Sequence, residues 1–173
     1  FGQTLYRLLQ NDFDITVYTR KPPVIPAQAG IHGSRTLPAG RQVESGMTNF
    51  TSNLQVAYTN DVIFYAVPMS AFEEVLSNHK SYITDNHLLI DVLSVKCYPK
   101  QIFEQVLADK KTQAILTHPM FGPDSSKEGF DHLPIIIEQF KSDNETYTFW
   151  KNYFNEKKLH FIEMTAEEHD KLS

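Results

Sequence analysis

Short apolar runs alternate with amphipathic segments along most of this chain, and the alternation limits the folds open to it more than any other feature. The runs have the length of strands, and the segments between them place apolar residues at helical spacing. Strands are predicted over 15–18, 62–67, 88–92, 114–116, 134–137 and 159–164, and helices after Gly2, from about Ser70, from Pro99 and around Trp150. Repeated units of this kind predict an α/β fold with a doubly wound, mostly parallel sheet.

Size and charge exclude several classes of protein. A chain of 173 residues suits one well-buried core rather than two full domains. The net charge is −5 and no run of Lys or Arg exceeds two residues, so neither nucleic acid nor an anionic membrane is expected as a partner. No apolar stretch approaches the roughly 18 residues of a membrane span. A single cysteine, Cys97, excludes a disulfide framework and favours a cytoplasmic location.

Residues 22–53 interrupt the strand and helix pattern. Pro22, Pro23 and Pro26 exclude a regular helix, and the glycines at 30, 33, 40 and 46 add turns with little hydrophobic periodicity. We expect a long loop, which is either functional or inserted. The segment 24–31 resembles translated bacterial interspersed repeat sequence, which favours insertion.

Both ends of the chain suggest a fragment. The chain begins at Phe1 rather than at a methionine. Near the other end, Thr165 and Glu168 have the spacing of a capping box, so a helix is predicted to start there although the chain stops at Ser173.

The first twenty residues hold a candidate cofactor site. Phe1 and Gly2 precede a helix, and that helix precedes a strand ending at Arg20, about where a Rossmann fold contacts the adenosine ribose. Gly2 is either the last glycine of a phosphate-binding turn or a glycine that permits close packing. Arg20 and Lys21, after Thr19, suit a 2′-phosphate, with a solvated strand end as the alternative.

The segment from Thr117 to Ser125 holds the candidate catalytic residue. Two prolines and a glycine fix its backbone, so His118 is expected at the carboxyl end of the sheet, as a base or as a structural histidine. The neighbouring strand leads to Ser94 and Lys96, which bring a hydroxyl and a cation to the same edge; a solvated lysine is the alternative for Lys96.

Other polar residues give weaker signals. Asp124 and Ser125 shape a substrate loop or only form a turn, and Cys97 is expected to pack. His169 faces a domain interface or is exposed on its helix. The remaining histidines lack metal-ligand spacing, so no metal site is predicted.

These segments, in this order, resemble the arogenate/prephenate dehydrogenase family. Phe1-Gly2-Gln3 is similar to the end of the family's glycine-rich turn, and Tyr18-Thr19-Arg20 to its second strand in NADP-using members. Further similar segments are Ala66-Val67-Pro68, Asp91 to Lys96, Thr117 to Ser125, Glu163-Met164-Thr165 and Glu168-His169-Asp170.

The resemblance implies an NADP-dependent oxidoreductase of tyrosine biosynthesis that oxidatively decarboxylates arogenate or prephenate, a small-molecule substrate. His118 would accept the hydroxyl proton, and Ser94 would orient this hydroxyl and contact the nicotinamide. The implied cofactor-binding residues are Phe1, Gly2, Gln3, Thr19, Arg20, Lys21, Ala66, Val67, Pro68 and Ser94. The alternatives are another NADP-dependent Rossmann dehydrogenase, such as a β-hydroxyacid dehydrogenase, and a non-catalytic nucleotide-binding remnant.

The resemblance also sets the expected domains. Residues 1–164 would form a Rossmann-type dinucleotide-binding domain that lacks its first strand, with the inserted loop at 22–53. Residues 165–173 would start a helical domain, otherwise absent, that completes the substrate site and forms a homodimer. The 173-residue chain alone is therefore expected to be inactive.

Overall fold

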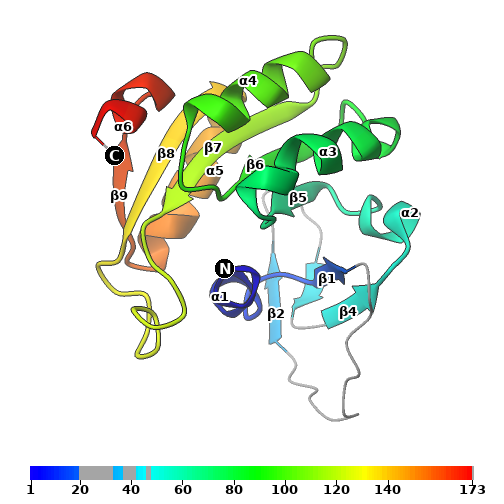
Figure 1. Ribbon diagram of the computed structural model, residues 1–173. Coiled ribbons are helices and arrows are strands. Elements are labelled where there is room, and N and C mark those ends of the chain that lie inside the picture. Colours follow the sequence, from blue (N-terminus) through cyan, green and yellow to red (C-terminus); the bar gives the residue numbers. More distant parts are fainter. Residues whose placement is uncertain (20–32, 37–41, 46–47, 173) are drawn as a thin grey trace. The chain divides into compact units, whose positions relative to one another are not determined.

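A computed structural model describes residues 1–19, 33–36, 42–45 and 48–172 of the protein (Figure 1). The chain divides into two compact units, Asp61–Ser173 together with Phe1, and Gly2–Asn60. In the part of the chain that is described, no helix has the length and hydrophobicity needed to cross a membrane.

The larger unit is built on a five-stranded sheet with the order β5-β6-β7-β8-β9. Its strands are β5 (Val62–Tyr65), β6 (Leu88–Asp91), β7 (Gln113–Pro119), β8 (Pro134–Lys141) and β9 (His160–Glu163). Its helices are α3 (Met69–His79), α4 (Cys97–Val106), α5 (Asn144–Glu156) and α6 (Ala166–Leu172), with a 3₁₀ turn η1 (Lys80–Tyr82). Within this five-stranded sheet only the β7–β8 pairing is antiparallel, so the predicted Rossmann-type, mostly parallel α/β sheet is confirmed.

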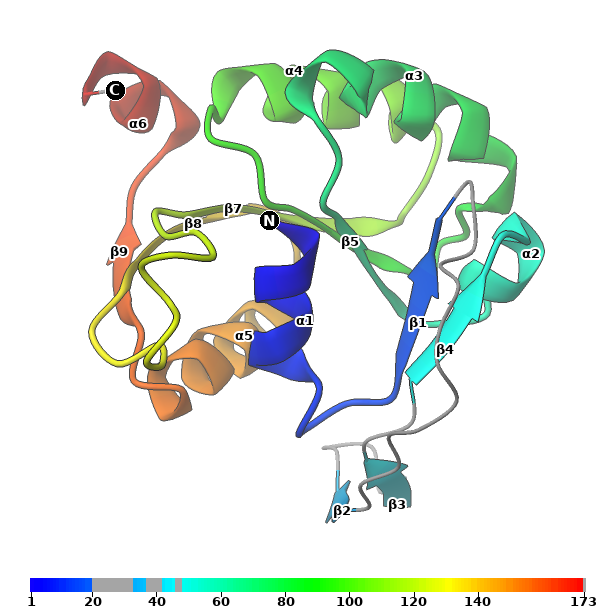
Figure 2. The same cartoon turned by 60° about the horizontal axis from the view of Figure 1, so that its bottom comes forward.

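Helices cover both faces of this sheet, with α3 and α4 on one face and α5 on the other (Figure 2). Successive residues of a strand point to opposite faces. On β5 the ring of Phe64 accordingly meets Trp150 of α5 at 5.3 Å between centroids. The next residue, Tyr65, meets Phe72 of α3 at 5.8 Å and Phe103 of α4 at 6.4 Å. The alternation in β5 therefore builds two aromatic core layers.

The smaller unit contains α1 (Gly2–Leu9), β1 (Ile15–Tyr18), β2 (Gly33–Thr36), β3 (Gln42–Ser45), β4 (Thr48–Thr51) and α2 (Leu54–Ala57). β1 and β4 pair in parallel, and β2 pairs with β3 in antiparallel fashion. The Tyr6 hydroxyl of α1 lies 2.9 Å from the Thr48 hydroxyl, and the Thr19 N–H extends the β1–β4 ladder by donating to the Thr51 carbonyl at 3.0 Å.

The prediction of one long loop over 22–53 is wrong for part of that range. Residues 48–51 are a strand that pairs with β1, and 33–36 and 42–45 form a hairpin. Strand β4 is short and polar except for Phe50, so its sequence carries little periodic signal; pairing with β1 selects it. Residues 20–32, 37–41 and 46–47 lie outside the described residues.

Two further elements bear on the site. The strand predicted at 114–116 extends over Gln113–Pro119 because β8 lies beside it and supplies hydrogen-bond partners. The predicted capping box is confirmed. The Glu168 N–H donates to the Thr165 hydroxyl at 3.2 Å, and the Thr165 N–H donates to the Glu168 carboxylate at 2.9 Å, so α6 has a defined start.

Candidate active site at the carboxyl ends of β6 and β7

The candidate site lies where β6 ends beside β7, close to the carboxyl end of β7. Asp91, the last residue of β6, is paired in register with Leu116 of β7, so Thr117 and His118 follow directly at the same edge. The segment 92–96, which contains Ser94, connects β6 to α4 at this edge. Ligands of open α/β sheets bind outside the carboxyl ends of the strands.

A buried ion pair fixes the backbone of this edge. The ammonium group of Lys96 contacts the carboxylate of Asp91 and the main-chain carbonyl of Thr117, and both side chains are at most 1% exposed. The Asp91 carboxylate also accepts the N–H groups of Leu93 and Thr117, each at 3.1 Å. The pair therefore ties the segment after β6 to the residue that precedes His118.

Burial governs the charges of this pair. It raises the pKa of Asp91, while the Lys96 ammonium and the N–H donors of Leu93 and Thr117 oppose the rise. Burial likewise lowers the pKa of Lys96, and the Asp91 carboxylate opposes that shift. The alternative of a solvated Lys96 is wrong, since this side chain is enclosed and supports the backbone on which His118 sits.

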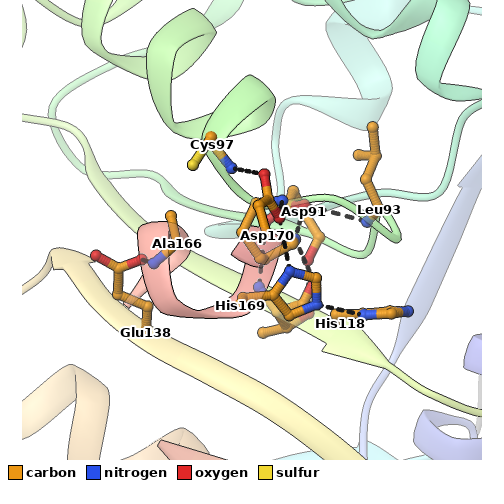
Figure 3. Close-up of polar contacts among 10 residues, drawn as sticks. Asp91, Leu93, Cys97, His118, Glu138, Ala166, His169 and Asp170 are labelled. Atoms are coloured by element: carbon orange, nitrogen blue, oxygen red, sulfur yellow. Dashed lines mark hydrogen bonds and ion pairs between the residues drawn. The ribbon is translucent and has the colours of Figure 1, made fainter. Parts of the chain in front are cut away.

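His118 is half-buried and is held by a second histidine (Figure 3). Its Nδ1 lies 2.8 Å from Nε2 of His169 in α6, and the two rings meet edge to face. Burial, the neighbouring His169 and the Lys96 ammonium lower the pKa of His118 to about 4, against the opposing influence of Asp170. The imidazole is therefore neutral at physiological pH and able to accept a proton.

Asp170 completes this line of side chains. Nδ1 of His169 lies 2.7 Å from Oδ1 of Asp170, whose carboxylate also accepts the main-chain N–H groups of Lys96 and Cys97, each at 2.8 Å. Burial by itself raises the pKa of Asp170, but these hydrogen bonds outweigh it and lower the pKa to about 2. Asp170 is thus a carboxylate that can only accept hydrogen bonds.

Helix α6 is anchored where it starts. The Ala166 N–H donates to the Glu138 carboxylate of β8 at 2.6 Å. Lys100 of α4 lies 3.0 Å from carboxylate oxygens of both Glu138 and Glu167. These contacts join α6 to α4 and β8, and so hold His169 against His118.

The structure places some predicted cofactor residues at the same edge of the sheet. Ala66, Val67 and Pro68 directly follow β5, which runs parallel to β6, and Pro68 is the N-cap of α3. Ala66 and Ser94 are exposed.

The other predicted cofactor residues that the structure describes belong to the smaller unit, apart from Phe1. The Phe1 ring lies 6.0 Å from the Phe121 ring, between centroids. Gly2 and Gln3 begin α1, and Thr19 follows β1, all within the smaller unit. Arg20 and Lys21 lie outside the described residues.

The sequence left two environments possible for His169, and the packed environment predicted for Cys97 is wrong. His169 is only 2% exposed, so the alternative of an exposed helical histidine is wrong. Cys97 is exposed instead of packed. One signal for His169 was available, since it lies three residues after the buried Ala166 and so shares its helix face.

Comparison with known proteins agrees with this architecture. Residues 34–163 match the family model described as prephenate dehydrogenase, nucleotide-binding domain. A protein of Methanocaldococcus jannaschii named probable arogenate/prephenate dehydrogenase is 27% identical over 150 residues, which are 81% of this chain and 33% of that protein. Arogenate dehydrogenase 2, chloroplastic, of Arabidopsis thaliana is 31% identical over 116 residues, covering 64% of this chain and 32% of that protein.

Solved structures share the fold. The crystal structure of prephenate dehydrogenase from Aquifex aeolicus, in complex with hydroxyphenyl propionate and NAD⁺, superimposes with a TM-score of 0.59 at 17% identity. The match covers 72% of this chain and 46% of that chain. The chain spans about a third of the length of the curated relatives that it matches.

Proposed function

Because the chain belongs to the prephenate dehydrogenase family through its nucleotide-binding domain, we propose that it serves the NADP-dependent oxidative decarboxylation of arogenate or prephenate. The observation that carries this proposal is a half-buried, neutral imidazole, His118, at the sheet edge where dinucleotide cofactors bind in such folds. Beside it runs the segment that contains Ser94.

The residues at this edge fit a nicotinamide. Ala66 and Ser94 are small and exposed, which leaves room for a flat ring, and the Ser94 hydroxyl can hydrogen-bond to a carboxamide or a substrate hydroxyl. A bound nicotinamide cofactor would supply the hydride acceptor. Ala66, Val67 and Pro68 are proposed to contact it, together with Phe1, Gly2, Gln3 and Thr19. Arg20 and Lys21 are proposed to contact a 2′-phosphate.

In this proposal His118 acts as the general base. As the hydroxyl-bearing ring carbon loses its hydride, the hydroxyl becomes more acidic and gives its proton to the neutral imidazole. Ser94 orients the same hydroxyl. A pKa of about 4 makes His118 a weak base at pH 7. It suffices here because the substrate hydroxyl that gives up the proton becomes more acidic during the reaction. The ring carboxylate then leaves as carbon dioxide, its bonding electrons stay with the ring to give a phenol, and aromatisation drives the reaction.

A direct assay tests the function. The protein expressed from its complete gene is incubated with arogenate or prephenate and with NADP or NAD, while reduced cofactor and carbon dioxide are measured together. Equimolar release of both with either substrate supports the proposal. Reduced cofactor without carbon dioxide, in a parallel incubation with a β-hydroxy acid, indicates the alternative dehydrogenase. Cofactor binding without turnover of any of these substrates indicates a non-catalytic remnant.

Partners follow from the same proposal. The partner is a small-molecule substrate, and a homodimer in the cytoplasm is proposed from the family. Sedimentation of the product of the complete gene at micromolar concentration tests the dimer, and a single monomeric species would contradict it.

A further inference from the structure

We infer that His169 and Asp170 of α6 determine which ring nitrogen of His118 carries the proton, and so leave Nε2 as its acceptor atom. The catalytic meaning of this inference rests on the proposed function. The assignment of the proton rests only on the contacts of these three side chains.

The surroundings of Asp170 fix it as a hydrogen-bond acceptor. Two main-chain N–H groups, from Lys96 and Cys97, point at its carboxylate at 2.8 Å. A carboxylate has no proton to donate, so the 2.7 Å contact between Oδ1 and Nδ1 of His169 requires a proton on that nitrogen. The protonated nitrogen of His169 is therefore Nδ1.

The position of the proton on His169 fixes the position of the proton on His118. A neutral imidazole with its proton on Nδ1 has a lone pair on Nε2 and can only accept there. Nε2 of His169 faces Nδ1 of His118 at 2.8 Å, so Nδ1 of His118 must be the donor. By the same rule, Nε2 of His118 is then the nitrogen with a free lone pair.

The geometry leaves that lone pair available. In Figure 3, the second nitrogen of His118 points away from His169. Among the described residues, the contact with His169 is the one hydrogen bond that the side chain of His118 makes. A donor that approaches Nε2 of His118 therefore meets an acceptor.

The same three side chains can take up the charge that follows. When Nε2 of His118 gains a proton, its Nδ1 proton can move to Nε2 of His169, which places the imidazolium beside the Asp170 carboxylate. One proton enters at Nε2 and none leaves the line, so the total charge rises by one. The titratable His169 and the charged Lys96 and Asp170 act on His118, and Asp91 partly neutralises Lys96.

Nuclear magnetic resonance tests the assignment without any substrate. Long-range ¹H–¹⁵N correlation on the ¹⁵N-labelled chain at pH 7 separates protonated from bare imidazole nitrogens, and His118→Asn identifies the His118 signals. We expect Nδ1 of His118 to be protonated and Nε2 bare. The opposite pattern would mean that a doubly protonated His169 donates to His118, and would overturn the inference.

Two variants test whether His169 determines the tautomer of His118. His169→Gln keeps an amide near the position of Nε2 but can present either its oxygen or its nitrogen, and His169→Asn is too short to reach His118. Both should leave His118 with mixed tautomers. His160→Asn is the matched control, since His160 is exposed on β9 and should leave the tautomer of His118 unchanged. If both His169 variants kept the wild-type tautomer, the inference would be wrong.

Kinetics separates the two proposals. In the protein from the complete gene, His169→Asn should lower kcat about 100-fold and leave the cofactor Kd unchanged, because a misplaced imidazole proton disables a general base. If His118→Asn is inactive while His169→Asn is fully active, the positioning role fails and the function stands. If His118→Asn is itself fully active, the proposed role of His118 fails, whatever the tautomer.

Discussion

Asp170, in the last helix, accepts the main-chain N–H of Cys97, 2.8 Å away and 73 residues earlier in the chain. Helix α4 begins after Lys96, whose side chain makes no capping hydrogen bond to the helix. The carboxylate of Asp170 fills that role from another helix and also orients His169. One side chain thus joins the stability of α4 to the orientation of the proposed base.

The first prediction concerns His118 itself. In the protein from the complete gene, His118→Asn should lower kcat by about 100- to 10,000-fold, because a positioned base contributes that much. Calorimetry should show unchanged cofactor affinity, since the substitution removes no group proposed to hold the dinucleotide. His160→Asn should retain wild-type kcat, and a His118 variant within a few-fold of wild type would contradict the role.

The second prediction concerns the buried ion pair. Lys96→Met leaves the Asp91 carboxylate enclosed without its cation, which should lower the free energy of unfolding by about 3–5 kcal/mol. Lys158→Met is the control, because Lys158 pairs with Asp131 on the surface, where such contacts contribute about 0–1 kcal/mol. Urea denaturation of the chain measures both.

A double variant separates charge from packing. Asp91→Leu combined with Lys96→Met removes both charges, and apolar replacement of a buried pair is often neutral or stabilising. The double variant should therefore recover part of the stability lost in Lys96→Met. If it were less stable than Lys96→Met, the hydrogen bonds of Asp91 to Leu93 and Thr117 would matter more than the charge balance.

The third prediction concerns acid denaturation. The pKa of Asp170 is lowered from 3.8 to about 2, so its ionised form stabilises the native state above pH 3.8. That contribution, about 2 kcal/mol, is lost as pH falls from about 4 to 2. Asp170→Asn should flatten the decline of stability in that window, as measured by urea titrations at successive pH values. An unchanged slope would contradict the shift.

His118 acts in a higher pH window, where protonation creates a positive charge instead of neutralising a negative one. Its pKa falls from 6.5 to about 4, so the unfolded chain binds the extra proton first and stability decreases as pH falls from 6.5 to 4. His118→Asn should remove that decrease and leave the decline below pH 4 in place. Equal slopes for wild type and variant between pH 6.5 and 4 would contradict the shift.

Local patterns were enough to predict most of the larger unit. Strand-length apolar runs located β5, β6 and β8, and the capping box located α6, because each of these signals lies within a few neighbouring residues. The pairing of β4 with β1 was missed, since a four-residue polar strand is selected by its partner rather than by its own composition.

The candidate site, too, could be predicted only in part. His118 and Ser94 were predicted because they follow the strands expected at 114–116 and 88–92, at the edge where parallel sheets present side chains. In the structure His118 lies within β7, which extends to Pro119. The contacts of His118 with His169 and of Lys96 with Asp170 join residues 51 and 74 positions apart. Contacts over such distances depend on how α6 packs against α4 and β7, which no local pattern encodes.

The fourth prediction concerns the choice of cofactor. If Arg20 and Lys21 bind a 2′-phosphate, NADP should bind more tightly than NAD by roughly the 1.5–3 kcal/mol of a charge-assisted hydrogen bond. Arg20→Ala should weaken NADP binding and leave NAD binding unchanged, so NAD is the internal control. Calorimetric titration with both cofactors measures the difference. Equal affinities in the wild type, or equal weakening in the variant, would contradict the assignment.

The fifth prediction concerns the segment between β1 and β4. The hairpin of β2 and β3 pairs with itself, in a sheet separate from β1 and β4, and an isolated hairpin adds little stability. The proposed insertion should therefore be replaceable from residue 22 to residue 47, whereas a replacement that extended through Asn49 would remove half of β4.

The length of the linker that replaces residues 22–47 should decide whether β1 and β4 still pair. β1 and β4 are parallel, with Ile15 level with Thr48, so the connection must return along the whole strand. Parallel strands need a crossover of about a dozen residues. A twelve-residue Gly/Ser linker should change the free energy of unfolding by no more than about 1–2 kcal/mol, because loop-closure entropy varies only with the logarithm of length. A four-residue linker is the control and should break the β1–β4 pairing. If urea denaturation shows the twelve-residue version to be as damaged as the four-residue one, the segment is part of the architecture rather than an insertion.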